Sequence, residues 1–435
     1  MNPGHLLSGL ALGLWLLLSL SRSIPARAEE SSSQVIDRSN WHEVQGLLPE
    51  PVLKWVEKGD AVLDVSQLHF HPADFLPPAC KESVALNDGK YDVDADGVLT
   101  EKQSGKPPAL LLGYPFPKID ESRPEAGLKL MYNMIYYTYA CGNVLAHSDA
   151  VWVGRQTGHE REINFEFFQF PLDGWSGAKE EPNPENIESY SIIRIVAPFD
   201  IAGTNVLTWR YRDKRLDNTF TYIPAIRRVR RMSPANRSDA FVGSDFTVDD
   251  AWLYSGKVNA FEWKILKKTD QLLPFMSSDP QPLVRNAEGE YETTRTAKVP
   301  LLGYQKAGWT GAPWFPTNLV WQKRPAYILE CRAKDRYYNY GIQYLWIDAE
   351  TFQPNFKVIH DRSGGYWKVV WQPLAAWEET NTQVRLLNPA CMVSTDDRND
   401  HSTVLMFASR KNVHRYFAIM DRNNFSLSGF EKLCK

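Results

Sequence analysis

The stretch TNVLTWRYR, residues 204–212, decides the fold that we expect for this chain. Successive side chains of a β-strand point to opposite faces of the sheet. Along this stretch the apolar positions alternate with polar ones, so that Leu207, Trp209 and Tyr211 oppose Thr208, Arg210 and Arg212. The alternation predicts a strand with one aromatic face and one face in contact with water.

Two further stretches repeat the pattern. In residues 218–223 Phe220 and Tyr222 share a face, and in residues 258–266 Phe261, Trp263 and Ile265 oppose Glu262 and Lys264. The apolar face is either a core that helices fill, which alternation alone favours, or the lining of a ligand cavity. The residues predicted to line such a cavity are Trp209, Tyr211, Phe220, Tyr222, Phe261 and Trp263.

Stretches rich in β-branched and aromatic residues, separated by turn residues, predict more strands. We expect them over residues 162–170, 190–197, 326–332, 342–348, 355–361, 366–372, 404–407 and 415–420. Most gaps are too short for the crossovers that parallel strands need, so we expect a strongly curved antiparallel sheet of about nine to eleven strands. Residues 124–140 are expected to form a helix on that sheet, and residues 267–300 a long loop.

The N-terminus has the pattern of an export signal. An apolar run over residues 6–20 is too short for a comfortable membrane span, and Ala26-Arg27-Ala28 has the small-x-small form of a cleavage site. The alternative is an uncleaved anchor. We therefore expect a signal peptide over residues 1–28, a partly disordered and partly helical extension over residues 29–110, and a β domain over residues 111–435. A helical pattern over residues 41–57 is interrupted at Pro51, and residues 70–113 are expected to be loops.

Composition excludes several classes of function. The chain has 49 basic and 52 acidic residues, and a nucleic-acid-binding protein would need a basic excess. Five widely spaced cysteines, without a C-x-x-C pair, argue against a structural zinc site and leave an odd thiol; their pairing is not determined by the sequence. No nucleotide-binding, hydrolase or metalloprotease motif is present. We expect a protein that is not an enzyme and holds no metal or cofactor.

One segment carries unusual charge. Arg227, Arg228, Arg230 and Arg231 fall within five residues after a predicted strand. Arginine binds phosphate and carboxylate bidentately, so the run is a candidate contact for an anionic partner or for the rim of the cavity. The alternative is a solvated hairpin arm that pairs with nearby carboxylates, of which the sequence offers Asp239, Asp245, Asp249 and Asp250.

At this segment the chain resembles a known family. Tyr222-Ile223-Pro224, the arginine run and Gly243-Ser244-Asp245-Phe246 with Asp249-Asp250 are similar to the outer-membrane lipoprotein-sorting superfamily, in particular to an uncharacterised domain-of-unknown-function branch found in Gram-negative bacteria. The similarity extends to other motifs: residues 113–117, 126–129 with Asn133, 335–341, 347–352, Asp361-Arg362 with Trp367, 397–402 and 424–427.

The resemblance implies the fold of the LolA and LolB carriers, a curved antiparallel half-barrel whose concave face is covered by helices. In that fold acyl chains lie between the sheet and the helices, which favours the cavity over a filled core. We therefore expect a periplasmic carrier of an apolar cargo, such as lipid or lipoprotein acyl chains, that serves an envelope transport system beside an exporter and an outer-membrane protein. The alternative is an accessory or scaffold subunit that holds no cargo.

Overall fold

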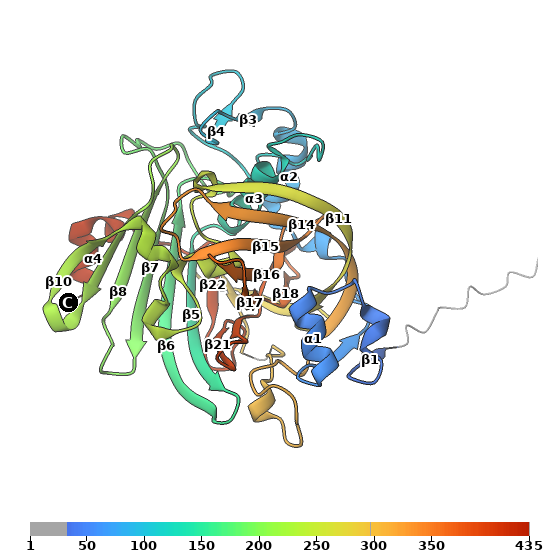
Figure 1. The fold of residues 1–435 in the computed structure, drawn as a ribbon. Helices are drawn as coiled ribbons and strands as arrows, with labels where there is room; N and C mark the ends of the chain where they lie inside the picture. The colour runs from blue at the N-terminus through green and yellow to red at the C-terminus, as the bar shows by residue number, and fades with distance from the viewer. Residues whose placement is uncertain (1–32, 296, 435) are drawn as a thin grey trace, which may run out of the picture. The chain divides into compact units, whose positions relative to one another are not determined.

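The computed structural model describes residues 33–295 and 297–434, which lie in one compact unit (Figure 1). Its centre is a curved run of strands in which every neighbour pair is antiparallel. In spatial order these strands are β11 (Phe261–Phe275), β14 (Val320–Ala333), β15 (Tyr340–Asp348), β16 (Pro354–Asp361), β17 (Tyr366–Trp371), β20 (Cys391–Asp396), β21 (His401–Met406), β5 (Val144–Gly154), β6 (Gly158–Pro171), β7 (Ile187–Ala197), β8 (Asn205–Tyr211), β9 (Asn218–Ile223) and β10 (Arg228–Met232).

A second run of strands leaves β5 and ends beside β11. It contains β22 (His414–Tyr416), β13 (Tyr291–Thr293), β12 (Gln281–Arg285), β18 (Leu374–Glu379) and β19 (Val384–Pro389). The short strands β1 (Gln34–Ile36) and β2 (Leu63–Val65) extend the sheet along β14, where β2 is parallel to β14. These 20 strands form one sheet, and β3 (Tyr91–Val93) pairs separately with β4 (Leu99–Glu101).

Four α-helices complete the unit, α1 (Glu50–Lys58), α2 (Pro78–Leu86), α3 (Ala126–Ala140) and α4 (Leu427–Leu433). Helix α3 is buried over most of its length and packs against β11. Gly127 allows this close approach, because a Cβ there would lie 3.0 Å from the backbone of Trp263. None of the helices within the described residues combines the length and apolarity that crossing a bilayer requires.

Short 3₁₀ helices connect these elements. They are η1 (Trp41–Val44), η2 (Pro72–Phe75), η3 (Pro224–Ile226), η4 (Pro234–Ser238), η5 (Phe241–Gly243), η6 (Val248–Leu253), η7 (Val258–Ala260), η8 (Gly303–Gln305) and η9 (Arg422–Phe425). Four of them, η4 to η7, follow one another between β10 and β11 and bring that part of the chain onto the inner, concave face of the sheet.

The predicted fold class is confirmed: the chain is mainly β, with a large curved antiparallel sheet and few helices. The predicted helix over residues 124–140 is confirmed as α3, and the pattern at Pro51 as the start of α1. The predicted strand number was wrong, because the sheet has 20 strands; among the missed strands, β5, β18 and β20 are buried on both faces and lack a clear alternation. The predicted loops were wrong in part, because the end of β11, β12 and β13 lie within residues 267–300 and α2 lies within residues 70–113.

The N-terminal predictions meet the structure only in part. The signal peptide over residues 1–28 lies outside the described residues. Residues 34–36 form the strand β1. β2, which precedes residue 110, is hydrogen-bonded beside β14. The three-part organisation stays a prediction.

Candidate functional site

A segment without regular α or β structure covers the concave face of the sheet. We call residues 237–255, from the end of η4 to the second residue after η6, the plug. The plug contacts β16 and β17 through η6. Three charged or polar anchors and one aromatic anchor hold it there, and each joins a plug residue to a side chain of the surrounding fold.

The first anchor is the carboxylate of Asp250, which is fully buried. It pairs with the ammonium groups of Lys357 on β16 and Lys368 on β17, the latter at 3.7 Å. The hydroxyl of Tyr340 donates a hydrogen bond to it at 2.6 Å, and the backbone N–H of Thr247 donates another at 2.8 Å. Burial alone would raise the pKa of Asp250, but the two lysines outweigh this effect and hold the pKa below its ordinary value. The carboxylate is therefore charged in the folded protein.

Two more anchors, Asp249 and Asp245, precede Asp250 in the plug. The carboxylate of Asp249 accepts hydrogen bonds from Arg237 at 2.6 Å and from the hydroxyl of Tyr338 at 3.0 Å. The carboxylate of Asp245 lies 2.7 Å from Nδ1 of His401 and accepts a hydrogen bond from Thr403 at 2.8 Å. Most of these residues belong to the motifs on which the family resemblance rested, so those motifs serve to fix the plug.

The last anchor is a strained turn of the plug. Trp252 and Leu253 have φ values of +52° and +62°, and Val242 has a φ of +51°. Residues with a Cβ rarely adopt this left-handed backbone conformation, which costs of order 1–3 kcal/mol per residue. The turn places the indole of Trp252 against the rings of Phe167 on β6 and Phe407, with centroid separations of 5.4 Å and 5.2 Å.

Three neighbouring cavities meet at Trp252, which lines all of them. The first has a volume of about 30 Å³ and lies between Trp252 and α3. The second, of about 80 Å³, is lined by both apolar and polar side chains of β6, β7 and β8, including Arg210. The third, also of about 80 Å³, has an almost entirely apolar lining; it includes Ala150, Trp152, Phe165, Ile193 and Leu405 from the sheet.

The two faces of β8 are both covered. Val206, Thr208 and Arg210 point towards the second cavity, whereas Leu207 and Trp209 pack against Phe425 and Phe430 near the C-terminus. The prediction that the polar face of this strand meets water is therefore wrong: Arg210 is buried and pairs with Asp217 at 2.8 Å. The C-terminal helix α4 covers the aromatic face of β8. The face with the polar side chains is therefore the one that points into the protein.

The six predicted cavity residues divide among separate places. Trp209, Phe220 and Tyr222 pack together with residues of η9 and α4. Phe261 and Trp263 pack with Tyr254 and Tyr338. Tyr211 lies under the guanidinium of Arg215, and its hydroxyl accepts a hydrogen bond from Asn218. None of the six lines the three described cavities, and their role as ligand contacts stays a prediction.

Sequence reasoning missed the residues that do line the cavities. Phe165 and Phe167 on β6, Ile193 on β7 and Trp252 were not selected. A usable signal was present in residues 162–170, EINFEFFQF, where phenylalanines occur at both odd and even positions. A strand that is apolar on both faces is covered on both faces.

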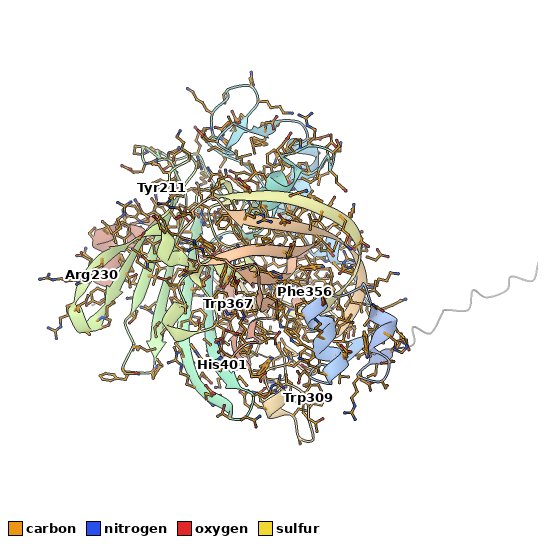
Figure 2. All side chains as sticks on the ribbon, in the orientation of Figure 1. Tyr211, Arg230, Trp309, Phe356, Trp367 and His401 are labelled. Atoms are coloured by element: carbon orange, nitrogen blue, oxygen red, sulfur yellow. The ribbon has the colours of Figure 1, made fainter. Side chains whose placement is uncertain are left out.

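The arginine run lies on the outermost strand of the sheet, as the position of Arg230 in Figure 2 shows. Arg227, Arg228, Arg230 and Arg231 are all exposed, and none forms an ion pair with another described residue. Pairing of the run with Asp239, Asp245, Asp249 and Asp250 is contradicted, because the last three pair with other cations and Asp239 accepts hydrogen bonds from Asn236 and Asn339.

Within the described part of the chain no cluster of three potential metal ligands occurs. His69 lies beside Asp279, and His71 lies beside Glu350. The five cysteines are all free thiols in this structure, and four of them are buried.

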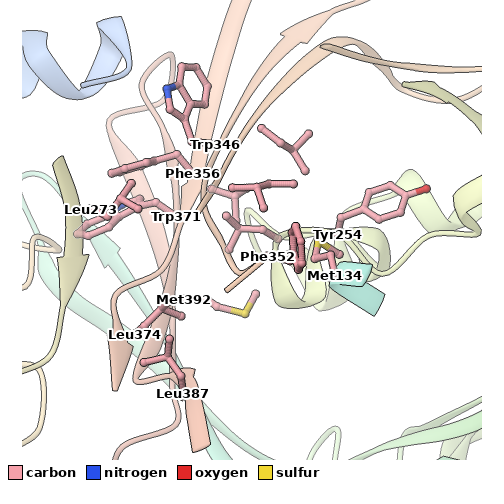
Figure 3. Packing of buried hydrophobic residues seen from close by; sticks show 14 of the residues in the cluster. Met134, Tyr254, Leu273, Trp346, Phe352, Phe356, Trp371, Leu374, Leu387 and Met392 are labelled. Atoms are coloured by element: carbon pink, nitrogen blue, oxygen red, sulfur yellow. The ribbon is translucent and has the colours of Figure 1, made fainter. Parts of the chain in front are cut away.

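The buried cluster next to the cavities joins α3, the plug and the sheet. Figure 3 shows Met134 of α3 and Tyr254 of the plug close to Phe352, with Met392 of β20 across the same space. Trp346 lies apart from these residues, on the other side of the strands.

A family model described as protein of unknown function (DUF1329) matches residues 35–429. Among solved structures, an outer membrane lipoprotein-sorting protein domain from Vibrio parahaemolyticus is 16% identical, covers 71% of this chain and 100% of its own, and has a TM-score of 0.47. A DUF1329 family protein from Desulfovibrio piger is 17% identical over 70% of this chain and 98% of its own, with a TM-score of 0.46. A LolA superfamily protein from Nitrosomonas europaea is 11% identical over 68% and 96%, with a TM-score of 0.39. No curated protein matches the chain significantly.

Proposed function

The chain belongs to the DUF1329 family of proteins of unknown function, and from this premise we propose that it is a periplasmic carrier of an apolar cargo. The cargo is a lipid, the acyl chains of a lipoprotein, or a similar molecule, and the carrier serves an envelope transport system. The family predicted from the motifs is confirmed by this match. The export pattern of the first 28 residues supports the proposed location.

The observation that carries the proposal is the set of cavities that meet at Trp252, between the concave sheet and the plug. Phe165, Phe167 and Ile193 line them and are only half-buried, although they are apolar. Half-buried apolar groups at an internal surface gain free energy when an apolar molecule covers them, by about 25 cal/mol per Å². No polar chemistry is needed for such binding.

The size of the cavities requires the plug to move when cargo enters. Each is smaller than the roughly 150 Å³ that holds benzene in an engineered protein cavity. Each buried methylene contributes about 0.8 kcal/mol, so ten of them would contribute about 8 kcal/mol. The strain of the turn at Trp252, of order 1–3 kcal/mol per residue, would be released if the turn rearranged and would lower the cost of moving the plug.

The same small volumes favour a second candidate function, in which the concave face is a closed core and the protein is a scaffold or accessory subunit. In either role the exposed arginines of β10 are proposed to contact an anionic partner. An exporter of the inner membrane and a protein of the outer membrane are the proposed neighbours.

Native mass spectrometry of protein purified from the periplasm distinguishes the two functions. The carrier should retain a co-purifying lipid or take up a fluorescent fatty acid with saturable binding. If repeated purifications give protein without bound cargo, and this protein takes up no fatty acid, the result would contradict the carrier and support the scaffold.

A matched pair of variants locates the site. Ile193→Glu places a carboxylate in the second and third cavities and should lower fatty-acid uptake at least tenfold. Val196→Glu makes the same change three residues further along β7, where the side chain is 50% exposed, and should leave uptake unchanged. Equal uptake by both variants would place the fatty acid elsewhere.

A further inference from the structure

The sheet ends at β10 in an edge without a neighbour. β10 pairs with β9 along one side, from Arg228 opposite Ile223 to Met232 opposite Thr219, and no described strand pairs with its other side. Alternate residues of an antiparallel strand direct their backbone N–H and C=O groups to opposite sides, so about half of the five residues of β10 present these groups outward. They form no backbone hydrogen bond with the rest of the described chain, and β10 lies at the margin of the fold (Figure 1). We call this side of β10 the open edge.

Other free edges of the sheet are covered or interrupted. β19 has β18 as its strand neighbour, but the hydroxyl of Tyr137 on α3 donates to the C=O of Leu387 at 2.6 Å and accepts from the N–H of the same residue at 2.9 Å. On β11, α3 packs against the strand and the ladder is shifted at Leu266 by a β-bulge. Covers and bulges of this kind prevent a further strand from joining a sheet. The open edge of β10 has neither a covering side chain nor a bulge among the described residues.

The open edge carries unpaired positive charge on one face. Arg228 and Arg230 alternate with Val229 and therefore share a face of the strand. Both are exposed, and neither forms a hydrogen bond or an ion pair with another described residue. Val229 packs on the other face into the cluster below α4, and Arg231 on that face donates a hydrogen bond to Asn218. The two guanidinium groups that remain free are thus spaced by two residues along an open strand.

This spacing of charge selects among the strands that could join the edge. Charged side chains protect edge strands from pairing with another copy of the same protein. Two copies of β10 placed edge to edge would bring arginine opposite arginine, and like charges directly opposite each other are destabilising. A strand with carboxylates at every second position meets the opposite situation, because unlike charges across a strand pair attract. The open edge is therefore closed to a second copy and suited to an acidic strand.

We propose that the open edge binds an acidic, extended segment of a partner protein, which joins the sheet as a further strand beside β10. Main-chain hydrogen bonds to the outward groups of β10 supply affinity, and Arg228 and Arg230 select carboxylates at every second position of the segment. This contact rests on the anionic contact proposed above for the arginine run, and it names the partner's chemistry and its geometry. It uses no residue that lines the cavities at Trp252, so it is the same for a carrier and for a scaffold.

The first test measures fluorescence anisotropy of a labelled octapeptide in which threonine and glutamate alternate. The uncharged comparison has glutamine in place of glutamate, and threonine favours an extended backbone in both. The purified full chain should bind the glutamate peptide saturably and at least tenfold more tightly than the glutamine peptide. The measurement is made at an ionic strength of about 0.15 M, because at low salt exposed arginines attract any anionic surface.

A matched pair of variants locates the binding. Arg228→Gln/Arg230→Gln should weaken the glutamate peptide at least tenfold and leave the weak binding of the glutamine peptide unchanged. Arg362→Gln/Arg410→Gln makes the same change of net charge at two exposed arginines outside β10, and it should bind the glutamate peptide normally. Equal binding by both variants would place the peptide elsewhere and overturn the proposal.

Hydrogen exchange separates strand addition from contact through charge alone. A strand that joins β10 protects its outward amides, so exchange within residues 228–232 should slow several-fold with saturating glutamate peptide, while exchange in β19 should not change. Binding without this protection, or no binding, would overturn the proposal. Vesicles of phosphatidylglycerol that bind at the salt concentration where the peptide does not would assign the arginines to a membrane surface instead. No fatty acid is present in these experiments, so their failure leaves the uptake experiment unaffected.

Discussion

The anchor at Asp250 offers the sharpest test of how the plug is held. Asp250, Lys357 and Lys368 have side-chain exposures of 0%, 1% and 4%, so water cannot compensate for a lost charge. The change Asp250→Asn leaves two buried ammonium groups beside a neutral amide. Removing one partner of a buried ion pair costs about 3–5 kcal/mol, and we expect a loss in this range.

The companion change Lys357→Met should cost less, close to 3 kcal/mol or below. Asp250 would keep Lys368 and the hydrogen bonds from Tyr340 and Thr247, while the methionine fills the volume of the lysine stem. Because the two changes disrupt the same pair, the double variant should lose less than the sum of the single losses, by at least 1 kcal/mol.

Urea unfolding followed by tryptophan fluorescence measures these free energies, and the initial rate of fatty-acid uptake reports opening of the plug. Asp250→Asn should raise that rate if the plug covers the cargo site. The control is Lys54→Met, which breaks the exposed Glu50–Lys54 pair and should cost no more than about 1 kcal/mol. A loss below 1 kcal/mol for Asp250→Asn, or strict additivity in the double variant, would refute the view that this anchor holds the plug.

Four further predictions concern other parts of the chain. The hydrogen bond to Asp245, together with the charges of Asp245 and Glu160, raises the pKa of His401. The stability that protonated His401 contributes is therefore complete below the unfolded pKa of about 6.5 and is lost as the pH rises through the folded pKa. Thermal melting between pH 5.5 and 9 should show this loss in the wild type but not in His401→Gln. Trp209→Ala should lower stability by about 3 kcal/mol without affecting fatty-acid uptake, because the ring packs on Phe425 outside the cavities, and a selective loss of uptake would contradict this placement. Arg228→Gln/Arg230→Gln should change stability by about 0.5 kcal/mol or less and weaken binding to anionic vesicles at low salt. Unchanged vesicle binding would indicate that the arginine run only contacts solvent. N-terminal sequencing of the periplasmic protein should begin near Glu29, and an intact Met1 in the cytoplasm would refute export.

The sequence located β8, which borders the second cavity, and its neighbour β9, but not β5, which borders the first and third. Period-2 alternation in residues 204–212 and 218–223 was sufficient to locate β8 and β9, and the helix signals around residues 124–140 located α3. These patterns arise from local backbone geometry, in which two or 3.6 residues complete a repeat, so they can be read without knowledge of distant residues. The motifs also predicted the family.

The tertiary structure decided which face of each strand is inside. Alternation separates Trp209 from Arg210, but it does not say which of the two faces the plug. That was settled by Phe425 and Phe430, more than 200 residues further along the chain, which return to cover the aromatic face. The partners of Asp249 and Asp250 were hidden for the same reason. Arg237 is close in sequence, but Lys357 lies 107 residues away and reaches Asp250 only because the sheet curves around the plug. A local pattern fixes the direction of a side chain relative to its own strand, whereas its burial and charge partner depend on long-range packing.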